Sequence, residues 1–158
     1  MDKDAIVAMR ELLTSRKVLC LAAIIDGEPT ASLLPYAVAP DMRSVYVQAS
    51  TLARHSRAFE AGATISLLVH GLDTEEVDPL QVARLTVQAV VEPFERGTEA
   101  FEAASRVFIA RLPSADMTLG LADFTLYRLR LGRGRYVAGF AQAYNVGPDT
   151  FQQLAHVD

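Results

Sequence analysis

Residues 18–39 read VLCLAAIIDGEPTASLLPYAVA, and this stretch decides the fold. The apolar run 18–25 has the length of a buried strand. Asp26 and Gly27 follow it, a dipeptide that suits a two-residue type I′ turn because both positions accept positive φ. The stretch 30–39 then predicts the return strand, so an antiparallel sheet begins here with a β-hairpin.

The rest of the chain predicts more strands of the same kind, joined by short turns and helices. We expect the further strands at 44–50, 63–70, 82–94, 123–131 and 135–140, with Gly132-Arg133-Gly134 joining the last two. We expect helices at 3–15, about 52–61 and 98–112, and loops at 71–81 and 113–120. Strands at this spacing favour a closed or partly closed antiparallel barrel with peripheral helices. The fold class is therefore mainly β, with the barrel over about 18–140 and a tail over about 141–158.

Composition limits the class of protein. The chain has 158 residues, enough for one domain over 1–158 with a sizeable core. Its net charge of −4 and pI of about 5.4 argue against a nucleic-acid-binding domain, which is usually basic. The single cysteine, Cys20, forms no internal disulfide, and its apolar neighbours predict a buried side chain. Because we find no signal peptide and no long apolar segment, we expect a cytoplasmic protein without membrane or nucleic-acid partners.

A second stretch, STLARHSRAF at 50–59, gathers polar and basic side chains where a strand passes into a helix. Ser50 or Thr51 is expected to cap this helix, with Arg54 and His55 in or just after its first turn. Cations at this end of a helix oppose the helix dipole unless an anion is bound there. A phosphate would accept hydrogen bonds from the free backbone N–H groups, the hydroxyls and a guanidinium group. The alternative is an ordinary capped helix with solvated arginines.

These stretches carry a resemblance to a known family. The runs PTASLLPYAV (29–38), STLARHSRAF (50–59) and DFTLYRLRLGRGRYVAGF (123–140), with the strands around SLLVH and RLTVQAVVEP, resemble the FMN-binding split-barrel family related to pyridoxamine 5′-phosphate oxidase. Within that family, the haem-utilisation branch is the most similar. The resemblance implies an antiparallel split β-barrel with flanking helices that forms a homodimer. It also implies FMN as the cofactor, held at the dimer interface, and an oxidoreductase activity.

The resemblance further implies a set of cofactor-binding residues. Ser50, Thr51, Arg54 and His55 would hold the phosphate, with His55 in place of the family's lysine. The strand matching the family's flavin contacts would face the ring, and two residues beyond it would contact the ring or a substrate. The residues expected in these roles are Ser32, Leu33, Leu34 and Tyr36 on that strand, and Arg84 and Tyr136 beyond it.

Three functions stay open from the sequence. The first is an FMN-dependent oxidoreductase, in which the flavin supplies the redox chemistry. The second is a haem-binding or haem-degrading protein that uses the same dimer cleft, with His55 or His156 contacting haem. The third is a barrel without a cofactor that acts as a binding module, because Ser32 and Ala37 stand where the oxidase has an arginine and a lysine. No residue is assigned a catalytic role, and the three histidines lack the spacing of a protein metal site.

Two further groups of side chains each have two interpretations. Four aromatic rings would either line a ring-binding cleft or pack in the core or a dimer interface: Tyr36, Tyr136, Phe140 and Tyr144. Four arginines form a basic stripe that is either a solvated strand face or a partner for haem propionates or a phosphate: Arg128, Arg130, Arg133 and Arg135.

Overall fold

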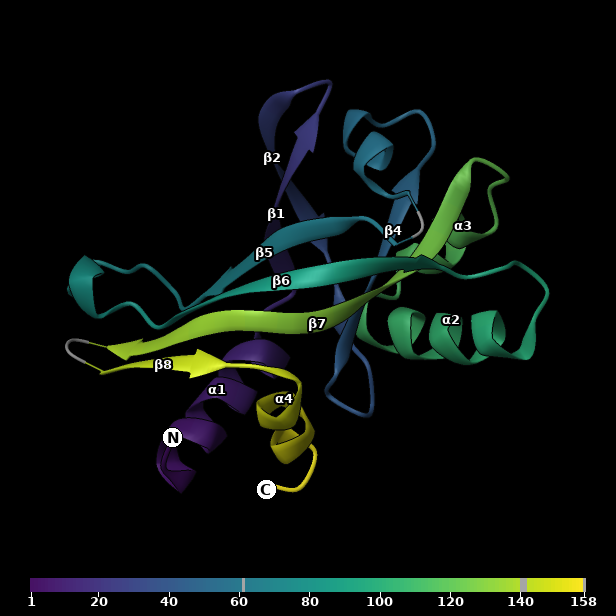
Figure 1. Ribbon diagram of the computed structural model, residues 1–158. Coiled ribbons are helices and arrows are strands. Elements are labelled where there is room, and N and C mark those ends of the chain that lie inside the picture. Colours follow the sequence, from purple (N-terminus) through teal and green to yellow (C-terminus); the bar gives the residue numbers. More distant parts are fainter. Residues whose placement is uncertain (61, 140–141, 158) are drawn as a thin grey trace.

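The computed structural model describes residues 1–60, 62–139 and 142–157. These residues form one curled antiparallel sheet of eight strands, with helices on its flanks (Figure 1). The strand order is β2-β1-β5-β6-β7-β4-β3, and β8 pairs with the last part of β7. The predicted fold class, a mainly β split barrel with flanking helices, is confirmed. None of the helices in the described ranges is long and apolar enough to cross a membrane.

The elements follow the chain in an order close to the predicted one. The strands are β1 (Val18–Ile25), β2 (Glu28–Pro35), β3 (Ala37–Val38), β4 (Ser44–Ser50), β5 (Thr64–His70), β6 (Arg84–Pro93), β7 (Phe124–Gly139) and β8 (Gln142–Val146). The α-helices are α1 (Lys3–Ser15), α2 (Glu99–Arg111), α3 (Ala115–Leu119) and α4 (Pro148–Leu154). Two 3-10 turns are η1 (Arg54–Ala58) and η2 (Pro79–Gln81). The short elements α3 and η2 lie in the two stretches predicted as loops.

The predicted hairpin at the start of the sheet is confirmed. Asp26 and Gly27 have φ of 57° and 79°, as a type I′ turn requires, and they connect β1 to β2. The return strand ends earlier than predicted, because Tyr36 leaves it. The Tyr36 ring is fully buried, its hydroxyl donates to the Leu13 carbonyl at 2.6 Å, and its N–H donates to the Lys17 carbonyl at 3.0 Å. Burial raises the pKa of Tyr36, so its hydroxyl stays a donor that joins the sheet to α1.

The prediction of two strands at 123–131 and 135–140 is wrong, because β7 continues through Gly132 and Gly134. A β-bulge opposite Val87 and Ala89 accommodates this part of β7 against β6. A Cβ on Gly134 would lie 2.3 Å from the Thr86 carbonyl oxygen, so only glycine permits this approach. The glycines therefore let β7 run close to β6 without a break, and they do not form the predicted turn.

The prediction of a tail over 141–158 also needs correction, because β8 and α4 occupy most of it. Figure 1 shows α4 beside α1 under the sheet, and the Arg10 Nε donates to the Leu154 carbonyl at 3.1 Å. Phe151 and Leu154 are fully buried, so this segment completes the core. The predicted helix α1 is confirmed at both ends, with Asp2 accepting from the Ala5 N–H as its N-cap.

The two faces of the sheet differ in character. The inward face packs into a core that includes Leu19, Leu21 and Val87, all at most 2% exposed. The outward face of β1 and β2 keeps apolar side chains in contact with solvent: Val18, Ile24 and Leu33 are 47%, 68% and 65% exposed. Cys20 lies on this outward face opposite Leu33 and Leu68, and it is half-buried where a buried side chain was predicted.

We expect Gly134→Ala to lower the free energy of unfolding by about 1–3 kcal/mol, the range for forcing extra atoms into a packed site. The new Cβ would clash with the β6 backbone. Gly71→Ala is the matched control, because its nearest contact would be an ordinary 3.6 Å to the Ala83 carbonyl oxygen. Urea denaturation of both variants measures the difference, and equal stabilities would contradict the close approach of β7 to β6.

Candidate functional site

Strand β4 ends at a corner where Asp123, the residue before β7, accepts two hydrogen bonds. The Ser50 Oγ donates to the Asp123 Oδ2 at 2.7 Å, and the Thr51 N–H donates to the Asp123 carbonyl at 2.7 Å. We call residues 50–59 the β4–η1 corner. Asp123 was not singled out from the sequence, because its proximity depends on the pairing of β4 with β7.

The helix predicted at about 52–61 is a five-residue 3-10 turn, η1, and the predicted capping is wrong. The N-cap is Ala53, without a side-chain cap. The N–H groups of Leu52 and Ala53 donate to the Ser50 Oγ and carbonyl, at 3.1 and 3.0 Å, and the Ser56 N–H donates to the Ala53 carbonyl. These donors are therefore already used within the chain. Leu52 is 87% exposed, whereas Phe59 is buried.

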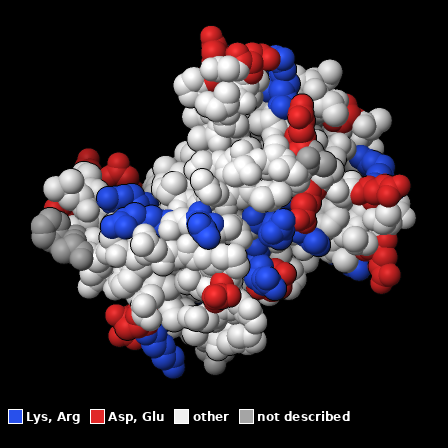
Figure 2. Space-filling view, in the orientation of Figure 1, with Lys and Arg blue, Asp and Glu red and all other residues white. Residues whose placement is uncertain are grey.

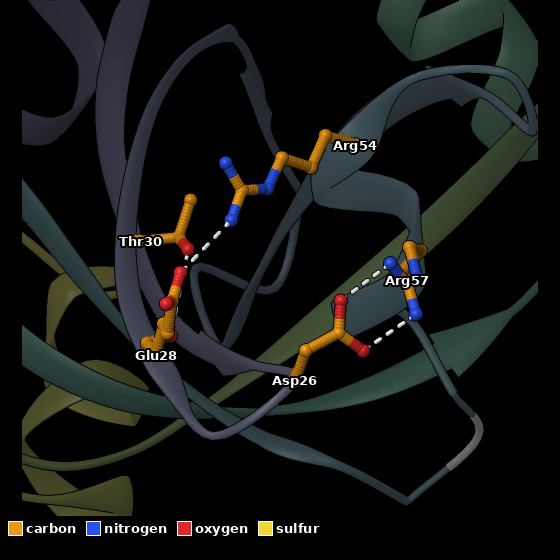
Figure 3. Close-up of polar contacts among 5 residues, drawn as sticks. All are labelled: Asp26, Glu28, Thr30, Arg54 and Arg57. Carbon is orange, nitrogen blue, oxygen red and sulfur yellow. Dashed lines mark hydrogen bonds and ion pairs between the residues drawn. The ribbon is translucent and has the colours of Figure 1, made fainter.

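Both arginines of the corner reach the β1–β2 hairpin and pair with its carboxylates (Figure 3). Arg57 donates through both terminal nitrogens to the two carboxylate oxygens of Asp26, each at 2.5 Å. The Arg54 Nη2 lies 3.5 Å from the Glu28 Oε2. More than half of each of these four side chains is exposed to solvent, so each ion pair contributes little to stability. The pairs do place the Asp26 and Glu28 carboxylates against the guanidinium groups of Arg57 and Arg54.

His55 differs from the arginines because it turns toward the protein. Its ring packs edge-on against Phe59 at a centroid distance of 6.0 Å, and Phe59 in turn packs against Tyr127. The Nε2 atom is buried and has no hydrogen-bond partner among the described residues. Burial lowers the pKa of His55, so the imidazole is neutral at physiological pH. A neutral imidazole with an unpaired nitrogen can accept a metal ion or a hydrogen bond.

A groove runs beside the corner, in two adjoining parts. One part, of about 610 Å³, lies between the end of β1, the segment 56–60 and the start of β5. The other, of about 470 Å³, lies on the outward side of β1, β2 and β5. They share Ala23, Ile24, Thr64 and Ile65, and we call them together the hairpin groove. Volumes of this order suit a small organic molecule. The smaller part has a mainly apolar lining, whereas the larger part is mainly polar and contains the Arg57–Asp26 pair.

The structure places the other predicted cofactor contacts apart from the corner. Tyr36, Tyr136 and Leu34 are buried in the core, with Tyr136 stacked on Tyr144. The remaining residues lie on two strands: Ser32 half-buried and Leu33 exposed on β2, and Arg84 exposed at the start of β6. The Arg84 Nη1 donates to the Val82 carbonyl. Phe140, a predicted aromatic of the cleft, lies outside the described residues. One chain thus brings Ser50, Thr51, Arg54 and His55 together but not the full predicted set, whose contacts stay predictions.

Figure 2 shows basic side chains in a row over β6 and β7, with acidic side chains beside them. Arg128 and Arg130 both pair with Glu92, at 3.8 and 2.7 Å. Arg135 donates to the Asn145 side chain at 3.2 Å. This arrangement favours the interpretation of the stripe as a solvated strand face.

Comparison with known proteins gives relatives for both the sequence and the fold. Haem oxygenase HutZ of Vibrio cholerae is 30% identical over 152 residues, which are 95% of this chain and 85% of HutZ. A crystal structure of HutZ matches with a TM-score of 0.70 and 29% identity, over 78% of this chain and 87% of that one. A heme binding protein from Mycobacterium smegmatis matches with a TM-score of 0.83 and 24% identity over 97% of this chain, which spans only 62% of its length. A protein of the pyridoxinephosphate oxidase family from Clostridium acetobutylicum matches with a TM-score of 0.69 and 15% identity, over 96% and 99% of the two chains. No family model matches the chain.

The curled antiparallel sheet and its neighbours define the class, a split barrel of the pyridoxamine 5′-phosphate oxidase type. Within that class, the chain belongs to the haem-utilisation family that contains HutZ.

The half-buried His55 predicts a pH dependence of stability. Its folded-state pKa lies below the unfolded value of 6.5, so the unfolded chain takes up the proton first as the pH falls. The stabilising contribution is complete above the unfolded pKa and is lost as the pH falls toward and through the folded pKa. We expect the free energy of unfolding to drop more between about pH 7.5 and about pH 5.5 in the wild type than in His55→Gln. Urea denaturation at the two pH values measures this difference. Equal losses of unfolding free energy in both proteins would contradict a lowered pKa of His55.

Proposed function

We propose that this chain binds haem in the hairpin groove and acts in haem utilisation. The relation to HutZ supports this, because HutZ is named a haem oxygenase and its crystal structure is described as that of a heme storage protein. Haem is a flat apolar ring with a central iron that accepts a neutral imidazole nitrogen. The groove and the corner beside it supply matching chemistry.

The state of His55 carries the proposal. An unpaired buried nitrogen costs free energy, so its presence at His55 calls for an explanation, and a bound ligand is one. Iron ligation would satisfy this nitrogen, and the neutral form that burial favours is the form that binds metal. Because Nε2 is covered here, the imidazole would turn toward the groove when haem binds.

Other residues of the chain have simpler roles in this proposal. Ala22, Ile24 and Ala31 line the apolar part of the groove, so they would receive one face of the ring and exclude water from it. The short side chains of Ala22 and Ala31 leave room for a flat ring. Bound haem would supply dioxygen binding and one-electron chemistry.

The FMN oxidoreductase uses the same corner and stays the alternative. A flavin phosphate needs free donors, and here the N–H groups of Leu52, Ala53 and Ser56 and both guanidinium groups already have partners. Haem makes a weaker demand, since its two carboxylates are singly charged and can extend into water. The haem proposal therefore suits this corner better than FMN does.

We also propose that two copies of the chain pair through the outward face of β1 and β2. Val18, Ile24 and Leu33 are exposed on this face, Ile24 also lines the groove, and pairing would remove their apolar surface from water. A partner on this face would also cover the open side of the groove.

We expect the wild type to be a dimer in solution, and Leu33→Asp to be a monomer because it places a charge in the proposed interface. Light scattering coupled to size-exclusion chromatography measures both masses. Leu80→Asp is the control, since Leu80 is 71% exposed in η2, away from this face. A monomeric wild type, or a dimeric Leu33→Asp, would argue against this interface.

The haem proposal predicts a Soret band when haem is titrated into the wild type. His55→Ala should lose the Soret band or weaken haem affinity about tenfold or more, since the proposed iron ligand would be removed. His70→Ala is the control, because the His70 Nδ1 lies 2.6 Å from the Gly71 carbonyl at the far end of β5. The absorption spectrum of the protein as purified shows whether haem or a yellow flavin is already bound.

Each outcome of the titration has a meaning. If the band survives in His55→Ala and disappears in His156→Ala, haem binding stands and His55 is not the ligand. Binding of FMN without haem would support the oxidoreductase, and binding of neither would support the barrel without a cofactor. Adding ascorbate and dioxygen distinguishes haem degradation, which bleaches the band, from binding alone.

A further inference from the structure

We infer that Asp26 and Glu28 determine the ligand specificity of the corner by holding its two arginines and excluding a phosphate-bearing cofactor. The inference deepens the proposed function and rests on it, because it concerns what the same groove accepts. The sequence alone marks the corner as a phosphate site. The structure shows carboxylates of the chain paired with both arginines of the corner (Figure 3).

The geometry at Arg57 is that of an anion site already filled. A guanidinium group recognises phosphate through two parallel N–H donors. Both terminal nitrogens of Arg57 already donate to Asp26 in this two-pronged manner, at 2.5 Å each. A phosphate could reach Arg57 only by displacing the Asp26 carboxylate.

The charges at the corner oppose a phosphate as well. The guanidinium groups of Arg54 and Arg57 pair with the carboxylates of Glu28 and Asp26, and a third carboxylate, that of Asp123, accepts from the Ser50 hydroxyl at the end of β4. These two arginines and three carboxylates together carry one negative charge in excess, and the neutral His55 adds no positive charge. A phosphate dianion would meet repulsion from these carboxylates at contact distance, where Coulomb terms are largest. An apolar ring in the groove would meet no such penalty.

The backbone fixes both carboxylates in place. Asp26 occupies the first left-handed position of the hairpin turn, with φ of 57°, and Glu28 is the first residue of β2, paired opposite Ile25. The register of β1 and β2 thus presents both side chains to η1. Asparagine also accepts the left-handed conformation, so Asp26→Asn removes the charge and keeps the turn.

The test compares FMN with riboflavin, which lacks the phosphate, by quenching of flavin fluorescence. We expect the wild type to bind the two with similar affinity. The double variant Asp26→Asn/Glu28→Gln should bind FMN about tenfold or more tightly than riboflavin. Adding Arg54→Ala and Arg57→Ala to it should abolish that preference. Glu75→Gln/Glu76→Gln is the matched control, because it removes two exposed negative charges in the loop before η2.

A second measurement covers the case in which the flavin ring does not bind. Inorganic phosphate should raise the melting temperature of Asp26→Asn/Glu28→Gln, and should leave the wild type and the control variant unchanged. Circular dichroism establishes that each variant is folded. A wild type that prefers FMN tenfold over riboflavin would overturn the inference. So would a double variant that shows neither an FMN preference nor stabilisation by phosphate.

Haem titration of the same variants separates this inference from the proposed function. The Soret change should be the same in the wild type and in Asp26→Asn/Glu28→Gln, since the removed charges act on phosphate. A wild type without haem binding would overturn the proposed function. The phosphate measurements would still decide the role of Asp26 and Glu28.

Discussion

The sheet depends on strand β7, which runs past β6 without a break because Gly134 has no side chain. The Thr86 carbonyl occupies the space where a Cβ of Gly134 would lie, so β6 and β7 can stay paired on both sides of the bulge. The uninterrupted β7 then pairs with β4 at its start and with β8 at its end. The first pairing brings Asp123 to Ser50, and the second positions α4 against α1. The corner and the closing of the core both depend on this one close backbone approach.

The ion pairs at the corner can affect which ligand binds there without adding much stability. The Arg57–Asp26 and Arg54–Glu28 pairs are exposed, so water competes with them and their net contribution is small. Their effect is on what else can approach. Because both arginines are paired and the half-buried imidazole of His55 is neutral, we propose that this site favours an apolar ligand over a doubly charged one. In a split barrel related to flavin enzymes, that difference bears on the choice of cofactor.

Much of the fold could be predicted from local patterns. The hairpin at Asp26-Gly27 and helix α1 follow from turn chemistry and helical spacing, and both are where the sequence placed them. The prediction failed where distant segments decide the local structure. Gly132 and Gly134 resemble turn residues unless their partner strand is known. The 50–59 stretch resembles a capped helix unless the contact of Ser50 with Asp123, at the start of β7, is known. The residues that matter most at the corner, Asp26 and Glu28, were taken only as part of a turn, since nothing local indicates that they face Arg57 and Arg54.

The position of Cys20 has a practical consequence. It is the only cysteine of the chain, and it lies half-buried on the outward face of β1, between Leu33 and Leu68. A thiol-reactive spin label or fluorophore would attach there without any engineering. Such a reporter would sense the environment of the β1–β2 face directly, and in the proposed dimer labelled pairs would give intermolecular distances across it by electron resonance or energy transfer.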